Sequence, residues 1–210
     1  MNAVKRKRQE GWQKILPHLQ FADIILTRDE RALLSRSIRK VTDSYWNHVV
    51  IVFNVPNNKT MFHNTLVIGA ENHGIEIHRL ERYTNHFDYI DVGVKRVPGL
   101  SEEMRQKVIS YVTNHVDIPY DYIRLFGFIV NALENFFKKG NAHLRTFLTN
   151  RDAFICSSFV QKAFYEIASP QKKNRMIFKN GFDALSSLEE VTPADIARSK
   201  NCQWIYNPHD

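Results

Sequence analysis

The chain has 210 residues, of which 43% are hydrophobic and 24% are charged, and it contains only two cysteines. This length and apolar content, without internal repeats or low-complexity tracts, are enough for one buried core and indicate a single domain. The formal net charge of +7 favours peripheral contact with anionic surfaces, although basic runs are most often solvated protein surface. No pattern of base-stacking aromatic residues is recognised, so we expect no nucleic-acid partner.

The sequence offers no signal for secretion, membrane insertion or structural zinc. The basic cluster at residues 5–8 is not followed by the apolar segment of a signal peptide. The longest membrane candidate, residues 125–130, is far short of the roughly 20 apolar residues that span a bilayer. Cys156 and Cys202 have no Cys or His partner at zinc-finger spacing. We therefore predict a soluble cytoplasmic protein with no disulfide, metal or cofactor.

The first elements in chain order are a basic helical extension and a buried strand. Residues 11–19 are predicted as a short helix, residues 21–27 as an apolar strand, and residues 28–42 as a helix or an excursion over the sheet. We accordingly divide the chain into an N-terminal extension, residues 1–19, and a catalytic domain, residues 20–210.

A histidine stands at the start of the next strand, in the apolar and β-branched stretch WNHVVIVF. In strand alternation His48 shares one face with Val50 and Val52, so the imidazole ends a row of core residues. An isolated histidine in this position is more often a satisfied core or rim residue than a catalytic base.

The following strand, residues 66–71, carries a carboxylate on a matching face. Val67, Gly69 and Glu71 alternate onto one side, so Glu71 lies beside His48 if the two strands pair in suitable register. In another register Glu71 is an ordinary strand-end residue near a turn, and the residues alone leave both interpretations open.

The middle of the chain is predicted to continue with two strands and two helices. Residues 75–80 and 89–97 alternate as strands, and Ser101 caps a helix that has acidic residues in its first turn. A proline-stopped turn then places Tyr120 at its tip. The long helix predicted over residues 122–138 carries aromatic side chains that pack on the sheet or cover a cleft.

A late amphipathic helix is predicted to begin with Cys156 in its first turn. Apolar residues then recur at three- and four-residue steps, at Phe159, Val160, Ala163, Phe164 and Ile167. Ser157 and Ser158 offer hydroxyls to unpaired backbone donors at the helix start, where the helix dipole favours a thiolate. A lone cysteine is more often a small core residue, but a nucleophile becomes the better interpretation when the chain also offers a base and an orienting group.

The C-terminal part of the chain contains a turn that Thr192 caps, with proline at the first helical position.

Six motifs stand in a diagnostic order: ADIILTR, WNHVVIVF, the strand before Gly74-Ile75, IPYDY, FICSSFV and TPADIARS. In this order the sequence resembles the circularly permuted NlpC/P60 proteins, the YiiX/YebB-like branch of papain-like cysteine hydrolases, over residues 20–206. The resemblance implies a single α+β domain with a papain-like antiparallel sheet packed with helices. It also implies that the nucleophile helix comes late in the chain.

The resemblance implies roles for individual residues. Cys156 corresponds to the nucleophile and His48 to the general base, with an acidic group such as Glu71 on the next strand orienting the imidazole. The backbone N–H of Cys156 would contribute to an oxyanion hole. The residues expected to bind substrate are Tyr120, Trp46, Asn47 and Ser157.

One position departs from the family pattern. The family strand reads V-I-E-A before a G-V turn, whereas this chain has glycine at position 69 and its acid at Glu71. Glu71 keeps the same strand face, so we expect a slipped register or a bulge to bring it to His48. If Glu71 does not reach His48, the site is a dyad or is inactive.

Three functions remain open from the sequence. The first is a cysteine amidase or peptidase acting on an N-acyl amino-acid, peptide or peptidoglycan-derived amide. The second is a lipid-directed acyltransferase or thioesterase, which the basic surface and the aromatic helix keep open. The third is a non-catalytic binding module for an anionic ligand, favoured if Gly69 marks a decayed site. The sequence identifies neither the acyl acceptor nor the oligomeric state.

Overall fold

The computed structural model describes residues 3–31, 36, 39, 44–56, 64–71, 74–116, 156–168, 176–178, 188 and 191–209. Tyr120 and the helix expected over residues 122–138 lie outside the described residues. In the part of the chain that is described, no helix is both long enough and apolar enough to cross a membrane.

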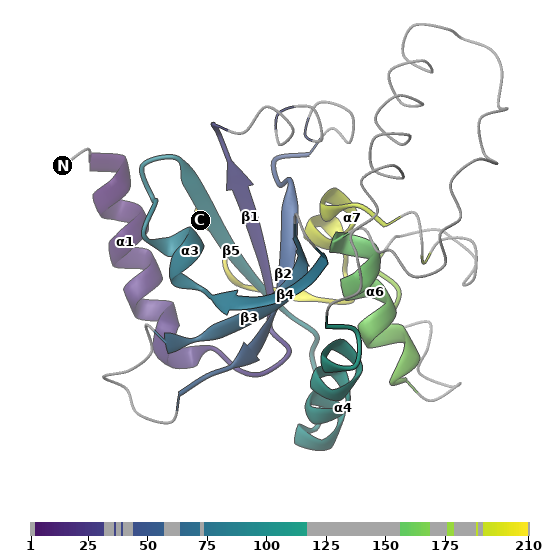
Figure 1. Ribbon diagram of the computed structural model, residues 1–210. Helices are drawn as coiled ribbons and strands as arrows, with labels where there is room; N and C mark the ends of the chain where they lie inside the picture. The colour runs from purple at the N-terminus through teal and green to yellow at the C-terminus, as the bar shows by residue number, and fades with distance from the viewer. Residues whose placement is uncertain are drawn as a thin grey trace, which may run out of the picture.

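Within the described ranges, six antiparallel strands form one sheet in the order β4-β3-β2-β1-β5-β6 (Figure 1). The strands are β1 (Ile24–Asp29), β2 (His48–Asn54), β3 (Leu66–Glu71), β4 (Gly74–Arg79), β5 (Ile90–Arg96) and β6 (Gln203–Tyr206). The central strands are rich in valine and isoleucine because both of their faces are covered, which suits β-branched side chains. An antiparallel sheet packed with helices confirms the predicted α+β class.

Helices cover both faces of the sheet. They are α1 (Ala3–Ile15), the 3-10 helix η1 (Leu16–His18), α3 (Glu81–Thr84), α4 (Glu102–Thr113), α6 (Cys156–Glu166) and α7 (Pro193–Arg198). In Figure 1, α1 and α3 lie on one side of the sheet, while α4, α6 and α7 lie on the other. The first helix begins eight residues before the predicted start, because the basic cluster is itself helical.

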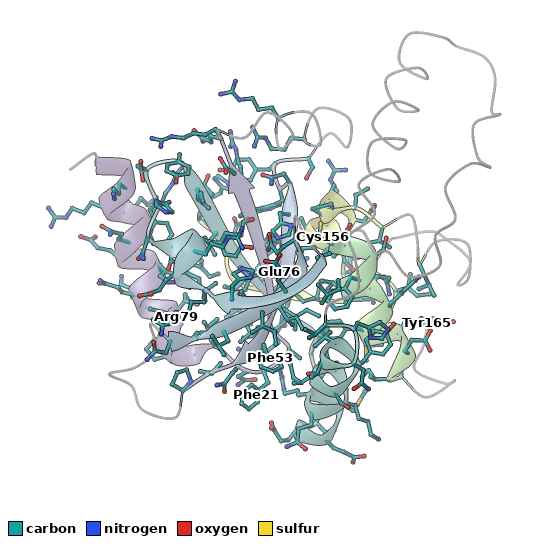
Figure 2. The ribbon with its side chains drawn as sticks, in the orientation of Figure 1. Phe21, Phe53, Glu76, Arg79, Cys156 and Tyr165 are labelled. Atoms are coloured by element: carbon teal, nitrogen blue, oxygen red, sulfur yellow. The ribbon has the colours of Figure 1, made fainter. Side chains whose placement is uncertain are left out.

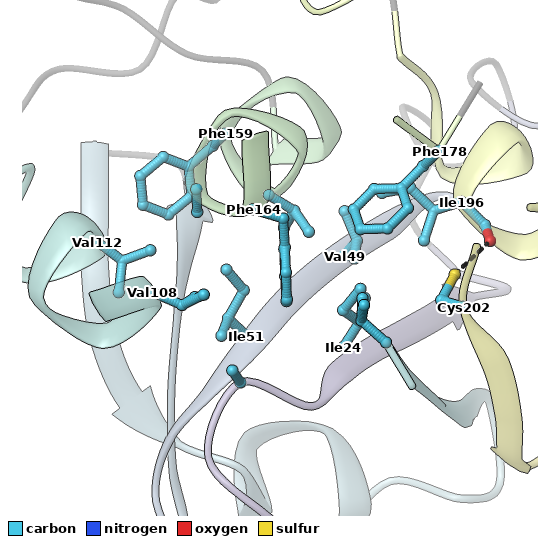
Figure 3. Packing of buried hydrophobic residues seen from close by; sticks show 14 of the residues in the cluster. Ile24, Val49, Ile51, Val108, Val112, Phe159, Phe164, Phe178, Ile196 and Cys202 are labelled. Carbon is cyan, nitrogen blue, oxygen red and sulfur yellow. Dashed lines mark hydrogen bonds between the residues drawn. The ribbon is translucent and has the colours of Figure 1, made fainter. Parts of the chain in front are cut away.

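Two apolar clusters fill the space between the sheet and these helices. Alternate residues of β2 serve the two clusters, with Val49 and Ile51 facing α6 and Val50 and Val52 facing α1. On the α6 side, Figure 3 shows Phe159 and Phe164 over the sheet, with Val108 and Val112 of α4 beside them. Burial of each such side chain stabilises the fold by about 1.5–3 kcal/mol. The sheet therefore forms a rigid base for the side chains at its strand ends.

Two of the short helices are held by side-chain caps that the sequence predicted. The Ser101 hydroxyl accepts a hydrogen bond from the backbone of Met104 at the start of α4. At α7, Thr192 and Asp195 form a complete capping box, with proline at the first helical position. Both predicted helix starts are confirmed.

Candidate active site

His48 and Glu71 face each other at the end where β2 begins and β3 ends. Val52 of β2 lies opposite Val67 of β3, and the same antiparallel register continued toward the start of β2 places His48 opposite Glu71. Nε2 of His48 lies 2.9 Å from Oε1 of Glu71. The register shift between these strands lies at the other end, between Val52 and Asn54. The contact between His48 and Glu71 needs no shift at this end, and a slip relative to the family strand stays a prediction.

Gly69 occupies a position that has no room for a side chain. The regular register places it opposite Val50, and a Cβ on Gly69 would lie only 2.5 Å from Cγ1 of Val50. The acid expected at this position of the family strand has no space here. Glu71, two residues further on the same face, contacts the imidazole instead, so the glycine does not leave His48 without a carboxylate.

Cys156 is the first residue of α6 and is 4% exposed. The helix packs against β2 and β3 (Figure 2), and this packing brings Cys156 near enough to the His48 side chain to raise the pKa of the imidazole. Because Glu71 engages Nε2 of His48, the ring nitrogen left for the sulfur is Nδ1. Sulfur, imidazole and carboxylate thus lie in one cluster, contributed by three separate elements.

The electrostatics of this cluster favour a charged imidazole and a charged carboxylate. Burial lowers the pKa of His48, but the charge of Glu71 and the contact with Cys156 outweigh it and raise the pKa to about 10. Burial raises the pKa of Glu71, but the charge and hydrogen bond of His48, together with a bond from Tyr83, lower it to about 2. The two groups therefore form an imidazolium–carboxylate pair over the neutral pH range.

Two further side chains, not singled out from the sequence, reach the same carboxylate. The hydroxyl of Tyr83 on α3 donates to Oε1 of Glu71 at 2.6 Å, and Nε2 of His78 on β4 lies 3.0 Å from the Tyr83 oxygen. Strand alternation carried a signal for His78, because it lies opposite Val67 and so shares the face of Glu71. Tyr83 gave no such signal, since it lies in a four-residue helix without periodicity.

Trp46 and Asn47, expected to bind substrate, are both buried beside His48. The Trp46 ring packs against Trp204, with ring centroids 5.8 Å apart. Oδ1 of Asn47 accepts a hydrogen bond from the backbone N–H of Asp29 at 2.8 Å. Both side chains therefore have structural partners, and their roles in substrate binding stay predictions.

Ser157 has a different hydrogen bond from the one expected. Its hydroxyl donates to the carbonyl oxygen of Val191 at 2.5 Å, and the residue is fully buried. This bond connects α6 to the segment that precedes α7. A hydroxyl that donates can also accept, so the expectation that Ser157 accepts from backbone donors at the helix start stays a prediction. The substrate-binding roles of Ser157 and Tyr120 stay predictions as well.

Comparison with known proteins supports the same type of site. A family model described as a permuted papain-like amidase enzyme, YaeF/YiiX, C92 family, matches residues 18–137. This range is more than half of the chain; it includes His48 and Glu71 and ends before Cys156. No curated protein matches the sequence.

A solved structure shares the fold. The crystal structure of YiiX from Escherichia coli O157:H7, described as a metalloprotein, matches with a TM-score of 0.57 and 20% sequence identity. The match covers 90% of this chain and 97% of that chain. Among the residues described here, no group of three or more His, Cys, Asp or Glu side chains is arranged to hold a metal ion, so we assign no metal ligands.

Proposed function

The protein belongs to the permuted papain-like amidase family, YaeF/YiiX, C92, and from this membership we propose that it hydrolyses an amide through Cys156, His48 and Glu71. The observation that carries the proposal is the His48–Glu71 hydrogen bond, with Cys156 at the start of α6 near enough to the imidazole to raise the pKa of His48. A nucleophile, an acid–base group and an orienting group in contact are what cysteine-dependent acyl transfer requires.

The first half of the proposed reaction forms a thioester. The Cys156 thiolate attacks the amide carbonyl carbon, and the carbonyl electron pair moves to oxygen, where the backbone N–H of Cys156 at the start of α6 donates a hydrogen bond. When the carbonyl re-forms, the carbon–nitrogen bond breaks. His48 gives its proton to the departing amine, which the raised pKa of about 10 allows, because the imidazole is protonated at neutral pH.

The second half returns the enzyme to its starting state. The neutral His48 takes a proton from water, and the hydroxide so formed attacks the thioester carbonyl. The carbon–sulfur bond breaks, a carboxylic acid leaves, and Cys156 departs as a thiolate beside the re-formed imidazolium. Through both halves Glu71 holds Nε2 of His48, so that Nδ1 keeps facing the sulfur.

The proposed substrate is an amide of an N-acyl amino acid, a peptide or a peptidoglycan fragment. Lipid-directed acyl transfer would pass through the same Cys156 thioester, but no contact among the described residues favours it. The third possibility, a non-catalytic binding module, was favoured only if Gly69 marked a site that had lost its carboxylate. The family of this chain is a family of enzymes, and Glu71 supplies the carboxylate that Gly69 lacks.

The two cysteines provide a matched test of the nucleophile. Cys156→Ala should lower kcat on a panel of short peptide amides and N-acyl amino acids by several orders of magnitude. Cys202→Ala, which removes the other buried thiol, should retain activity. Mass spectrometry of the quenched wild-type protein should show an acyl adduct on Cys156.

The origin of the acyl group in that adduct decides between the two enzymatic proposals. An adduct formed with the amide panel supports the amidase, whereas an adduct formed only with phospholipid vesicles supports lipid-directed transfer. Unchanged turnover in Cys156→Ala would eliminate both.

A further inference from the structure

One oxygen of the Glu71 carboxylate accepts two hydrogen bonds from different elements. Nε2 of His48 lies 2.9 Å and the Tyr83 hydroxyl 2.6 Å from the same Oε1 atom. Tyr83 is 7% exposed and comes from α3, outside the two strands that carry His48 and Glu71. A third element therefore fixes the position of this carboxylate.

The direction of each proton in this group follows from what each atom can donate. An ionised carboxylate only accepts, so the single hydroxyl proton of Tyr83 points to Glu71. The phenol oxygen must then accept from His78, whose Nε2 lies 3.0 Å away. Neutral His78 consequently carries its proton on Nε2 and a lone pair on Nδ1. That Nδ1 atom is buried and has no hydrogen-bond partner among the described residues.

His78 is neutral where the proposed reaction runs. Burial lowers the pKa of His78 to about 4; the charges of Arg82 and His48 act in the same direction, and Glu71 opposes them. The approach of His78 Nε2 to Glu71 Oε1, 3.6 Å, is therefore not an ion pair at neutral pH. His78 acts on the carboxylate by directing the Tyr83 hydroxyl.

We propose that His78 and Tyr83 form a brace, defined as the hydrogen bonds from His78 Nε2 to Tyr83 Oη and from Tyr83 Oη to Glu71 Oε1, that positions the orienting carboxylate of the active site. This inference rests on the proposed function and adds two positioning residues to it. A glutamate side chain has three rotatable bonds, and the brace holds its Oε1 in line with the imidazole. Small errors in such alignment are costly for catalysis.

Removal of the Tyr83 hydroxyl is the direct test. Tyr83→Phe should slow alkylation of Cys156 by iodoacetamide about 10-fold, since hydrogen bonds to charged groups are worth about that factor or more. Amide turnover should fall similarly in kcat, with little change in KM. Tyr111→Phe is the matched control, because it removes a half-buried phenol hydroxyl from α4 on the opposite side of the sheet (Figure 1). It should leave both rates within twofold.

Substitutions of His78 separate positioning from simple packing. His78→Gln keeps an N–H near the place of Nε2 and should stay within threefold of the wild-type rate. His78→Leu removes the donor and should reproduce the loss seen in Tyr83→Phe. A double variant that combines Tyr83→Phe with His78→Leu should be no slower than Tyr83→Phe alone, because His78 acts through the Tyr83 hydroxyl. Equal losses for glutamine and leucine would contradict the brace.

The pH dependence of Cys156 alkylation provides a second readout, because the rate falls at low pH along an acid limb. Tyr83 stabilises the charged form of Glu71, so Tyr83→Phe should raise the pKa of that carboxyl and move the acid limb to higher pH. The other groups that face Glu71, Tyr83 and His78 are His48, Arg82 and Cys156, and Glu76 pairs with Arg82. All of these are the same in both proteins.

The outcomes distinguish the brace from the proposed function. If His48→Ala and Glu71→Gln slow alkylation but Tyr83→Phe changes neither the rate nor the acid limb, the brace alone is overturned. If none of the three affects Cys156, the proposed function itself fails. Thermal melts identify a variant that does not fold. If Tyr83→Phe does not fold, the comparison of His78→Gln with His78→Leu becomes the test of the brace.

Discussion

The two cysteines of this chain are buried alike, and each has a cationic side chain beside it, yet their surroundings differ. Cys156 is 4% and Cys202 2% exposed. Cys156 contacts His48, whose far nitrogen is bound by a carboxylate. Cys202 lies beside Lys95 and donates to the carbonyl oxygen of Ile196 at 3.5 Å (Figure 3).

The two thiols differ in the other groups that their neighbouring cations, His48 and Lys95, bind. The Lys95 ammonium donates to the carbonyl oxygens of Ile196, Ala197 and Ser199, at 2.9, 2.7 and 2.9 Å. These bonds close the C-terminal end of α7, where carbonyls lack helical partners. Burial raises the pKa of Cys202 although Lys95 acts to lower it. Lys95 therefore holds the end of α7, and its charge beside Cys202 does not offset the effect of burial on that thiol.

The largest expected effect is a difference in alkylation rate between the two thiols. At neutral pH iodoacetamide should label Cys156 on the order of 100-fold faster than Cys202, because only Cys156 is paired with an imidazolium at a helix start. Peptide mapping after timed quenching measures both rates in one sample. In guanidinium the rates should converge. Equal rates in the native protein would show that the two surroundings are chemically equivalent.

The second effect concerns the His48–Glu71 pair. Glu71→Gln should reduce amide turnover about 10-fold while the protein stays folded, and should lower the free energy of unfolding by about 2 kcal/mol. Full activity in this variant would mean that another group orients His48. Circular dichroism during urea titration gives the stability, and initial rates give the turnover.

The same stability difference should depend on pH in a defined direction. The folded pKa of His48 is raised to about 10, so its contribution is complete below pH 6.5 and declines as the pH rises toward 10. The folded pKa of Glu71 is lowered to about 2, so its contribution is complete above pH 4.5 and declines toward pH 2. The gap between wild type and Glu71→Gln should therefore be widest between these limits. A gap that grows above pH 7 would contradict this assignment.

The smallest expected effect is that of substituting Lys95, the cation beside Cys202. Lys95→Met removes one donor from each of three carbonyls at the C-terminal end of α7 but also removes the cost of burying a charge, so a loss of about 1 kcal/mol in stability is expected. Amide turnover and Cys156 alkylation should stay within twofold of wild type. A large loss of activity with a small loss of stability would show that α7 is coupled to the site.

The sequence was informative where periodicity carries the signal. Alternation placed Glu71 on a strand face that could meet His48, and the regular register then decides the contact, which depends on pairing and not on either strand alone. The apolar stripe predicted the helix that begins at Cys156, and the Thr192 cap predicted α7.

The failures have equally physical causes. The first helix was predicted to begin near Gly11, but this glycine lies inside α1, where a Cβ would come within 2.8 Å of the Tyr206 hydroxyl. The glycine therefore lies at a close approach between distant segments and not at a helix boundary. The strand β6, which carries Tyr206, has four residues, too few for a periodic pattern. Tyr83 reaches Glu71 only through tertiary packing.

The crowding of Gly69 by Val50 also bears on how relatives of this chain should be compared. A comparison restricted to position 69 would record a missing acid and overlook the carboxylate of Glu71. Positions two apart on one strand point the same way, so both present their side chains to the same face. A search for homologues with this site should therefore accept an acid at either position, and glutamate at position 69 of this chain would require the Val50 side chain to shift.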